Sequence, residues 1–492
     1  IELLDTSSKD GHRIYIRGIL YIMAKALNEV YPEALLSVNY QLSSAMFCKI
    51  DNMEITDEMI ANVKARMQEI INQNLEIRKV VMTKEEAEEF YSNEKTLRGI
   101  VQIDNTQKEG VSLYYCEDYF NYFFGVMPVT TAYTDIFDVI KYGDGFLVRY
   151  PSAEKPNELT NYKSNKKLLS TLEEYEDIHR VLQIDTLYKL NKEIKEGRTS
   201  NVILLSEALH EKKMANIADD IAKRKNVKMV LIAGPSSSGK TTFAKRLGVE
   251  LRLNGLKPVT ISVDNYFVER VDNPKDENGD YDFECLEAID LELFNNHIKT
   301  LLDGGTIDVP TFDFKVGTKR YNGEKMHLAD DEILVIEGIH CLNDKLTSSI
   351  PREQKYKIYI SDLTVLNIDY CNRISTTDTR LIRRIVRDNN FRGYSALHTL
   401  RTWASVNRGE NKNIFPYQEN CDVMFNSSLI YELSVLKKQA LPLLQEITNA
   451  EPEYAEAKRL VEFLKYFEEV DEGLIPQNSL LREFVGGSIF GD

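Results

Sequence analysis

Short apolar runs alternate with amphipathic stretches through the second half of the chain. The runs are MVLIAG (229–234), PVTISV (258–263), EILVIEG (332–338) and YKIYIS (356–361). Runs that are apolar at nearly every position are typical of strands buried on both faces of a parallel sheet. The stretches between them carry apolar residues at helical spacing. We therefore predict an α/β domain over residues 227–450, with a doubly wound parallel sheet.

The chain shows other patterns on both sides of this domain. Residues 1–150 mix helical with alternating apolar positions, whereas residues 151–226 open with a polar segment and continue at helical spacing. The second stretch is predicted to be a helical connector. Helical patterns also follow the last predicted strand (422–428). Residues 451–492 are predicted to be a helical extension that packs on the body, and we assign it no chemistry.

Charge and composition limit the classes of partner. The 492 residues include 61 Lys and Arg against 77 Asp and Glu, a net charge of −16. Such a balance disfavours nucleic acid and anionic membranes as partners, and no apolar run reaches the length of a membrane span. The six cysteines form no CxxC pair, which favours reduced thiols and a cytoplasmic location. Residue 1 is not Met, so we expect that an N-terminal segment is missing.

The strongest motif is a phosphate-binding loop, because GPSSSGKT (234–241) matches GxxxxGK[ST]. An apolar strand precedes it and a helical pattern follows, which makes a chance match rarer than about one chain in fifty. In such a loop, backbone N–H groups and the helix N-terminus face phosphate oxygens, while the Lys reaches the outer phosphates and the Thr binds Mg²⁺. The predicted nucleotide-binding residues are Gly234, Ser236, Ser237, Ser238, Gly239, Lys240, Thr241 and Thr242.

Two carboxylates follow neighbouring predicted strands. Asp264 comes directly after PVTISV, and Glu337 closes EILVIEG. Ligands of doubly wound sheets bind beyond the carboxyl ends of the strands. We expect Asp264 to take the proton of an acceptor hydroxyl and Glu337, with Thr241, to hold Mg²⁺ directly or through water. The alternatives are a helix or turn cap for Asp264 and a solvent-facing strand end for Glu337.

Five arginines lie within thirteen residues, at Arg380, Arg383, Arg384, Arg387 and Arg392. The first, third and fourth of them share one helical face. Guanidinium groups beside a phosphate loop could clamp phosphates and neutralise charge in a transition state. The alternative is a solvated face that pairs with Asp378 and Asp388.

These segments together resemble uridine kinases and their phosphoribulokinase relatives. The loop GPSSSGKTT, then VDNYF, DFECLEAID, IDVPTFDF, VIEGIH and TRLIRRIVRDNNFRG occur in the order of that family, between about Lys228 and Leu443. The resemblance implies a P-loop kinase that uses ATP (or GTP) and Mg²⁺, with a lid and a small β-hairpin. It also implies that Asp264 is the base, that Lys240 is catalytic, and that Arg384 and Arg387 are lid arginines.

The acceptor pocket departs from the family pattern. Glu284 stands where the family has an Asp, and Phe312 stands where it has a Tyr. Gly317 replaces a His that would contact the base, and Tyr394 replaces the second arginine of the lid. A pocket without these polar groups discriminates less between acceptors. Uridine or cytidine is the leading acceptor, and another nucleoside, a sugar or a sugar phosphate stays open. The predicted acceptor-binding residues are Tyr266, Glu284, Phe312 and Arg392.

Residues 17–74 resemble the second additional (editing) domain of threonyl-tRNA synthetase, which implies an α+β fold. That domain uses a helical HxxxH and a later CxxxH, residues suited to metal binding or hydrolysis. Here these positions hold Arg17, Tyr21, Phe123 and Met127, and the first 150 residues carry a net charge of −8. We therefore expect a non-catalytic scaffold or regulatory module, and retained editing is the weaker alternative.

Two classes of function remain in competition. The first is a kinase whose partners are a nucleoside triphosphate and a small hydroxylated acceptor. The second is a nucleotide-dependent regulatory protein that uses the P-loop domain as a switch, which the altered acceptor pocket and the lost editing residues both favour. A homo-oligomer is possible in either case, and acceptor-dependent release of ADP would distinguish the two.

Overall fold

The computed structural model describes residues 5–92, 99, 110–161, 165–275, 279, 281–313, 316–329 and 331–491. The chain divides into two compact units. The first comprises Ile1–Glu196, Thr364–Ser375 and Lys465–Glu468, and the second Gly197–Leu363, Thr376–Leu464 and Glu469–Asp492. The domain boundaries expected at residues 150, 226 and 450 stay predictions.

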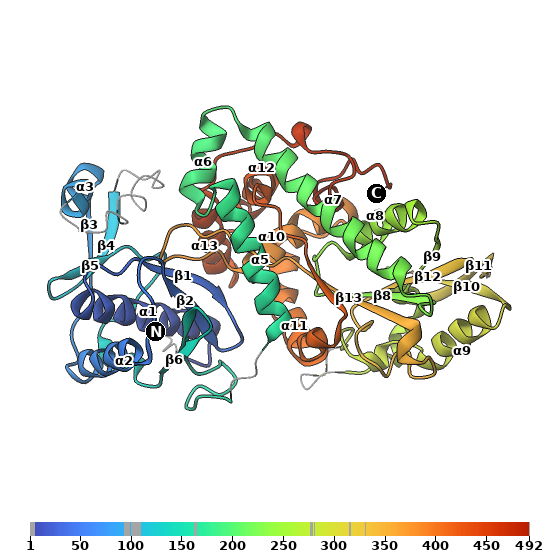
Figure 1. Ribbon diagram of the computed structural model, residues 1–492, viewed down its shortest axis with the longest axis horizontal. Coiled ribbons are helices and arrows are strands. Elements are labelled where there is room, and N and C mark those ends of the chain that lie inside the picture. The colour runs from blue at the N-terminus through green and yellow to red at the C-terminus, as the bar shows by residue number, and fades with distance from the viewer. Residues whose placement is uncertain are drawn as a thin grey trace. The chain divides into compact units, whose positions relative to one another are not determined.

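The first unit contains two antiparallel sheets and the helices that accompany them (Figure 1). The four-stranded sheet has the order β1-β2-β7-β6, from β1 (Leu36–Gln41), β2 (Ala45–Ile50), β6 (Asp138–Tyr142) and β7 (Gly145–Arg149). The three-stranded sheet has the order β3-β4-β5, from β3 (Arg78–Thr83), β4 (Gly110–Cys116) and β5 (Tyr119–Asn121). The helices are α1 (Lys9–Val30), α2 (Asp57–Asn72), α3 (Lys84–Ser92), α5 (Lys166–Leu182), α6 (Leu187–Lys195) and the 3₁₀ turn η1 (Thr131–Thr134).

Helices α1 and α2 form one core with the four-stranded sheet. Ile22 of α1, Met67 of α2 and Cys48 of β2 belong to the same buried cluster. Both helices begin at a side-chain cap: the Ser8 hydroxyl accepts a hydrogen bond from the Gly11 N–H, and Thr56 caps α2 in the same way. Such caps satisfy backbone donors that have no partner inside the helix. The first unit therefore has its own apolar core.

The second unit is built on a five-stranded parallel sheet with the order β14-β13-β8-β12-β9. Its strands are β8 (Met229–Ala233), β9 (Lys257–Ser262), β12 (Glu332–Glu337), β13 (Lys355–Ser361) and β14 (Val423–Asn426), with a hairpin of β10 (Thr306–Asp313) and β11 (Thr318–His327). Its helices are α7 (Thr199–Lys223), α8 (Lys240–Leu253), α9 (Leu291–Leu302), α10 (Thr376–Arg387), α11 (Ala396–Asn413), α12 (Glu432–Gln445), α13 (Tyr454–Leu464) and α14 (Arg482–Val485). The short turns are η2 (Val263–Tyr266), η3 (Arg270–Asp272), η4 (Leu286–Ala288), η5 (Arg352–Gln354), η6 (Asp388–Arg392), η7 (Phe415–Asn420) and η8 (Glu472–Leu474). The predicted parallel α/β sheet is confirmed.

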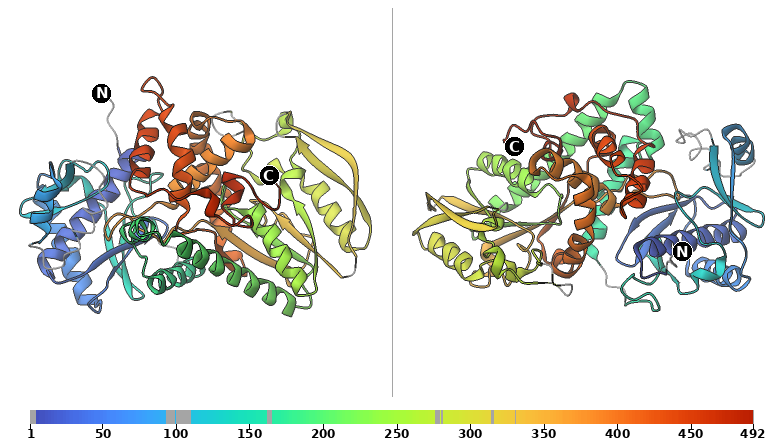
Figure 2. Two further views of the ribbon diagram at one scale, coloured as in Figure 1. Left: turned by 90° about the horizontal axis from the view of Figure 1, so that it is seen from above. Right: turned by 180° about the vertical axis from the view of Figure 1, so that it is seen from behind.

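Helices α7 and α8 cover one face of this sheet. Figure 1 shows them side by side, and their apolar residues share a buried cluster with β8, β12, β13 and β14. Phe243 of α8 packs on Phe425 of β14, with ring centroids 4.6 Å apart. The hairpin of β10 and β11 lies beside α9, as Figure 2 shows in yellow. Dense packing of this kind holds the strand ends in fixed positions.

The register of the sheet places three strand ends at one level. Glu337, the last residue of β12, is paired with Ile232 of β8 on one side and with Ser262 of β9 on the other. Because the strands are parallel, the segments that follow them leave the sheet at the same edge. The phosphate loop after β8 and the turn η2 after β9 therefore begin at the same edge of the sheet, on the two sides of β12.

The region predicted as a helical connector is helical, but its helices belong to different units. Helices α5 and α6 lie in the first unit, whereas α7 lies in the second and packs on the sheet. Over the residues that the structure describes, none of the helices is both long enough and apolar enough to span a membrane.

The orientation of α8 predicts a contrast between two leucines. Leu247 is fully buried in the core, whereas Leu253, on the last turn, is 78% exposed. We expect Leu247→Ala to lower the free energy of unfolding by about 2–5 kcal/mol and Leu253→Ala to change it by less than about 0.5 kcal/mol. Urea unfolding followed by circular dichroism measures both values. Equal losses would contradict the orientation described for α8.

Candidate active site

The loop between β8 and α8 is curled as a phosphate-binding loop requires. A Cβ on Gly234 would lie 1.9 Å from the carbonyl oxygen of Ile360 in β13, so only glycine fits there. Further along, Ser237 and Gly239 have φ angles of +59° and +85°. Left-handed residues in such a loop turn successive N–H groups towards a common centre, and the N-terminus of α8 adds its positive dipole end.

Polar groups of the loop fit a phosphate. The hydroxyls of Ser237 and Ser238 are buried and make no hydrogen bond within the described residues. The Lys240 ammonium donates to the carbonyl oxygens of Gly234 and Pro235, both at 3.1 Å. Unpartnered buried donors are costly, and a phosphate would accept hydrogen bonds from all three side chains.

A buried ion pair holds the first half of the loop. Arg380 of α10 donates two hydrogen bonds, both 2.6 Å long, to the Glu410 carboxylate of α11, and neither side chain is more than 2% exposed. Glu410 also accepts the Ser236 N–H at 2.8 Å, and Arg380 donates to the Ser236 carbonyl oxygen at 3.3 Å. The Trp403 ring lies beneath the Arg380 guanidinium. The pair therefore fixes both backbone groups of Ser236.

The neighbouring Arg383 has a similar structural role. Its guanidinium donates to the carboxylate of Glu432 in α12 at 3.0 Å and to the Ser237 carbonyl oxygen at 3.3 Å. It is 1% exposed and lies over the Phe484 ring. Arg380 and Arg383 are therefore engaged in holding the loop, which the sequence pattern did not distinguish from phosphate clamping.

The other three arginines gather around one buried carboxylate. Arg384, Arg387 and Arg392 contact the two oxygens of Asp388 at 3.2, 3.3 and 3.4 Å. Arg384 also donates to the Ser236 hydroxyl at 2.9 Å. Burial, and next the charge of Arg392, lower the pKa of Arg387 to about 10. The three guanidinium groups are partly desolvated and repel one another, so an additional anion would stabilise their charged forms.

The two predicted carboxylates lie near each other and near Lys240. Glu337 is 8% exposed and accepts a hydrogen bond from the Ser262 hydroxyl at 2.7 Å. Burial and the negative charge of Asp264 raise its pKa to about 7. Asp264 lies in η2 and is open to solvent. The surrounding protein still raises the pKa of its carboxyl by desolvation, against the charges of Lys240, Arg392 and Arg387.

Two of the predicted acceptor-binding residues lie with a group of aromatic rings. Phe312 of β10 contacts Phe267, which contacts Phe283, at centroid distances of 5.5 and 6.4 Å. Glu284 follows Phe283, and burial and the charge of Glu410 raise its pKa to about 7. The structure does not bring Tyr266 into this group. Its hydroxyl lies 3.1 Å from Nδ1 of His297, and the residue is 1% exposed.

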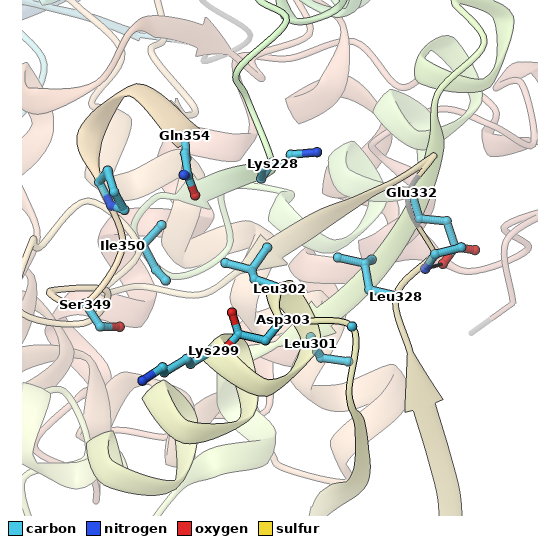
Figure 3. Close-up of a pocket in the computed structure, with 13 residues that line it drawn as sticks. Lys228, Lys299, Leu301, Leu302, Asp303, Leu328, Glu332, Ser349, Ile350 and Gln354 are labelled. Atoms are coloured by element: carbon cyan, nitrogen blue, oxygen red, sulfur yellow. Dashed lines mark hydrogen bonds between the residues drawn. The ribbon is translucent and has the colours of Figure 1, made fainter.

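A separate cavity of about 420 Å³ lies at the opposite edge of the sheet (Figure 3). Lys228 and Gln354 line it directly before β8 and β13, and Glu332 begins β12. These are the amino ends of the strands, whereas Gly234 and Asp264 follow the carboxyl ends. The cavity is therefore not the candidate active site.

Comparison with known proteins gives a match that lies largely in the second unit. Residues 229–432 match the model of the phosphoribulokinase/uridine kinase family. A uridine kinase of Ligilactobacillus salivarius is 30% identical over 187 residues, which are 38% of this chain and 78% of that protein. A uridine kinase of Bacillus subtilis is 27% identical over 222 residues, which are 44% of this chain and 96% of that protein.

The chain belongs to the phosphoribulokinase/uridine kinase family. It is a phosphotransferase whose acceptor is an alcohol group. Among solved structures, a possible uridine kinase from Bacillus stearothermophilus covers 44% of this chain and all of that chain, at 17% identity and a TM-score of 0.29. The predicted resemblance to this family is confirmed, whereas the resemblance of residues 17–74 to the synthetase domain stays a prediction.

Glu410 was not among the residues expected from the sequence, and Asp388 was expected only as a partner of a solvated arginine face. Glu410 holds the loop through Ser236, which lies 174 positions away in the chain, and Asp388 gathers three of the arginines. A single acidic residue in a polar helix carries no sign of such a contact. Only the unusual density of arginines in α10 indicates that buried acidic partners must exist, because a buried charge without a partner is very costly.

The raised pKa of Glu337 predicts a pH-dependent stability. Its pKa is about 7 in the folded protein against 4.5 normally, so folding loses stability as pH rises through this range, up to about 3 kcal/mol. Glu337→Gln has no such charge. We expect its melting temperature, relative to the unaltered chain, to rise between pH 5 and pH 8 in calorimetry without nucleotide. A difference that is constant or falls with pH would refute this.

The ion pair around Ser236 predicts a loss that a second change repairs. Glu410→Gln leaves the Arg380 charge buried without a counter-charge, so we expect about 3–5 kcal/mol of lost stability and weaker nucleotide binding. Arg380→Gln together with Glu410→Gln should recover part of this stability.

Glu451→Gln is the control for this experiment, because it breaks a pair with the exposed Arg401 and should cost less than about 1 kcal/mol. Urea unfolding and titration with ATP measure the effects. Additive losses in the double variant would contradict the description of the pair.

Proposed function

We propose that the chain is an ATP-dependent (or GTP-dependent), Mg²⁺-requiring kinase that transfers the γ-phosphoryl group to a nucleoside hydroxyl. Uridine or cytidine is the leading acceptor, and a related small hydroxylated compound is the alternative. The observation that carries the proposal is the position of Asp264 at the carboxyl edge of the sheet, within electrostatic reach of Lys240. The relatives from Bacillus subtilis and Ligilactobacillus salivarius are uridine kinases.

In this proposal, each residue of the site has a separate role in phosphoryl transfer. Asp264 accepts the proton of the acceptor hydroxyl, and its raised pKa makes it a stronger base than an ordinary aspartate. Lys240 leaves the loop carbonyls and turns to the outer phosphates. Arg384 and Arg387 neutralise charge that develops on the transferred group. The remaining loop residues surround the phosphates of the nucleotide: Gly234, Ser236, Ser237, Ser238, Gly239, Thr241 and Thr242.

Mg²⁺ fits the oxygen donors at this edge. The metal prefers one or two carboxylates together with substrate phosphates, and Glu337 and the Thr241 hydroxyl supply such oxygens. Ser262 donates to one Glu337 oxygen at 2.7 Å, which orients the carboxylate. When bound, the metal would neutralise phosphate charge.

The acceptor pocket supports a nucleoside but not uridine alone. Phe267 and Phe312 offer aromatic surfaces to a base or a sugar, and Glu284 offers a carboxylate to adjacent hydroxyls. Gly317, where the family pattern has a base-contacting His, lies against the Arg270 side chain: a Cβ there would be 2.7 Å from its Nε. A sugar phosphate is therefore the second candidate, because a guanidinium group suits an anionic acceptor, whereas it gives no such preference for a neutral sugar.

The first unit supports a scaffold or regulatory role. Tyr21 and Phe123 pack edge to face with ring centroids 5.7 Å apart, and Arg17 donates to the Val126 carbonyl oxygen at 3.0 Å. Met127 is buried in the same core. The residues at the positions of the two histidine motifs therefore serve packing. We propose that this unit has no editing activity, and release of serine from a seryl ester of tRNA by residues 1–196 would refute this.

A screen of acceptors with a matched pair of variants tests the kinase. Nucleosides, sugars and sugar phosphates are each incubated with ATP and Mg²⁺, and ADP release is followed. We expect Asp264→Asn to bind ATP as the unaltered chain does and to lose about 10²–10⁴-fold in kcat. Asp331→Asn makes the same charge change at an exposed ion pair with Lys257 and should keep its rate.

Near-normal kcat of Asp264→Asn on its best acceptor would refute the assignment of the base. Tight nucleotide binding with slow hydrolysis that no acceptor accelerates would favour a nucleotide-dependent switch instead.

A further inference from the structure

The C-terminal segment of the second unit, residues 469–491, lies against the phosphate-binding machinery. Leu480 belongs to the core cluster of α7, α8 and the sheet. Phe484 is fully buried beneath the Arg383 guanidinium. Lys245 of α8 donates to the Phe490 carbonyl oxygen at 3.1 Å, and Figure 1 shows the C-terminus beside α8. The segment is thus packed on the second unit through both side-chain and backbone contacts.

One carboxylate of this segment occupies a donor of the phosphate site. Oε2 of Glu483 in α14 accepts a hydrogen bond of 3.0 Å from the N–H of Thr242, the third residue of α8. The first N–H groups of a helix have no partner inside the helix and attract anions. In a P-loop protein these are the groups that face phosphates. Glu483 therefore supplies an anion where a nucleotide would bring one.

The charge of Glu483 also reaches the other residues of the site. Its negative charge raises the pKa of Glu337. It also raises the pKa of Arg387, which burial lowers. Lys240 meanwhile donates to two carbonyl oxygens of its own loop. Both the Thr242 N–H and the P-loop lysine thus have partners within the protein.

The same segment contacts the arginine-bearing turn. Asn390 of η6 donates through Nδ2 to the Phe484 carbonyl oxygen at 3.1 Å. The residue next to Glu483 is therefore tied to the turn that carries Arg392. A displacement of α14 from α8 would therefore break the hydrogen bond between Phe484 and Asn390 of η6.

We propose that the C-terminal segment is an autoinhibitory element, in which the Glu483 carboxylate competes with a phosphate of the incoming nucleoside triphosphate for the Thr242 N–H. Nucleotide binding displaces Glu483 and releases the Asn390 contact, which frees η6 to close over the phosphates. The inference rests on the proposed use of a nucleoside triphosphate. It goes beyond that proposal because it assigns a regulatory role to a segment with no part in the chemistry.

Two other roles are open to the same contact. Glu483 could be a permanent cap of α8 that bound nucleotide leaves in place, or it could help to bind the nucleotide. A cap predicts no gain in nucleotide affinity when its charge is removed, and a binding residue predicts a loss. Only a competitor predicts a gain.

Titration calorimetry with Mg²⁺-ATP on the full chain tests the competition. A hydrogen bond to a charged group contributes enough that its removal as a competitor should tighten binding about tenfold. We expect this decrease in Kd for Glu483→Gln and for Glu483→Ala. Glu472→Gln is the matched control, since Glu472 lies in the same segment and accepts a hydrogen bond from Gln439. Its Kd should be unchanged.

Hydrogen–deuterium exchange provides a second readout that needs no acceptor. In the unaltered chain, saturating Mg²⁺-ATP should increase amide exchange in residues 480–491. Decreased exchange there, or variants at Glu483 that bind ATP equally or more weakly, would overturn the inference. If the unaltered chain and all variants unfold cooperatively but bind no nucleotide, the proposed function fails as well.

Discussion

The buried ion pair between Arg380 and Glu410 is the contact on which the candidate site depends. It joins α10 and α11 and fixes the N–H and carbonyl groups of Ser236 at the start of the loop. Charges so deeply buried are tolerated only when their hydrogen bonds are complete. Here each oxygen of Glu410 has a guanidinium partner, and one of them also has a backbone partner. The loop is therefore held in its curled form by contacts within the protein.

Several ionisable groups around this loop have pKa values that differ from their ordinary ones. Glu337 and Glu284 have pKa values raised to about 7, and the pKa of Arg387 is lowered to about 10. Each shift has burial as its largest cause, so Glu337, Glu284 and Arg387 lie in surroundings that disfavour their charged forms. A triphosphate with its metal would supply charges of both signs. Glu483 acts on both kinds of group: its charge raises the pKa of Glu337 further and opposes the lowering of the Arg387 pKa.

Much of the second unit could be predicted from particular residues. The apolar runs at 229–234 and 332–338 became β8 and β12, because an uninterrupted apolar strand is stable only inside a covered parallel sheet. GxxxxGK[ST] predicted the loop, since Gly234 and Gly239 meet demands of space and dihedral angle that are local. The position of Asp264 and Glu337 at one edge followed from strand polarity. The sequence did not distinguish Tyr266 from its neighbour Phe267: Tyr266 contacts Phe294 and His297, whereas Phe267 contacts Phe312.

The sequence by itself determined the kinase fold and the edge at which its chemistry lies, because both follow from periodicity and from motifs within a few residues of each other. Tertiary structure alone decided which arginines hold the loop, which gather around Asp388, and that Glu483 reaches Thr242 across 241 positions of the chain. Such contacts pair single charged residues far apart in sequence, and a charge in a helix looks the same whether its partner is water or a buried group. Only folding brings the partners together.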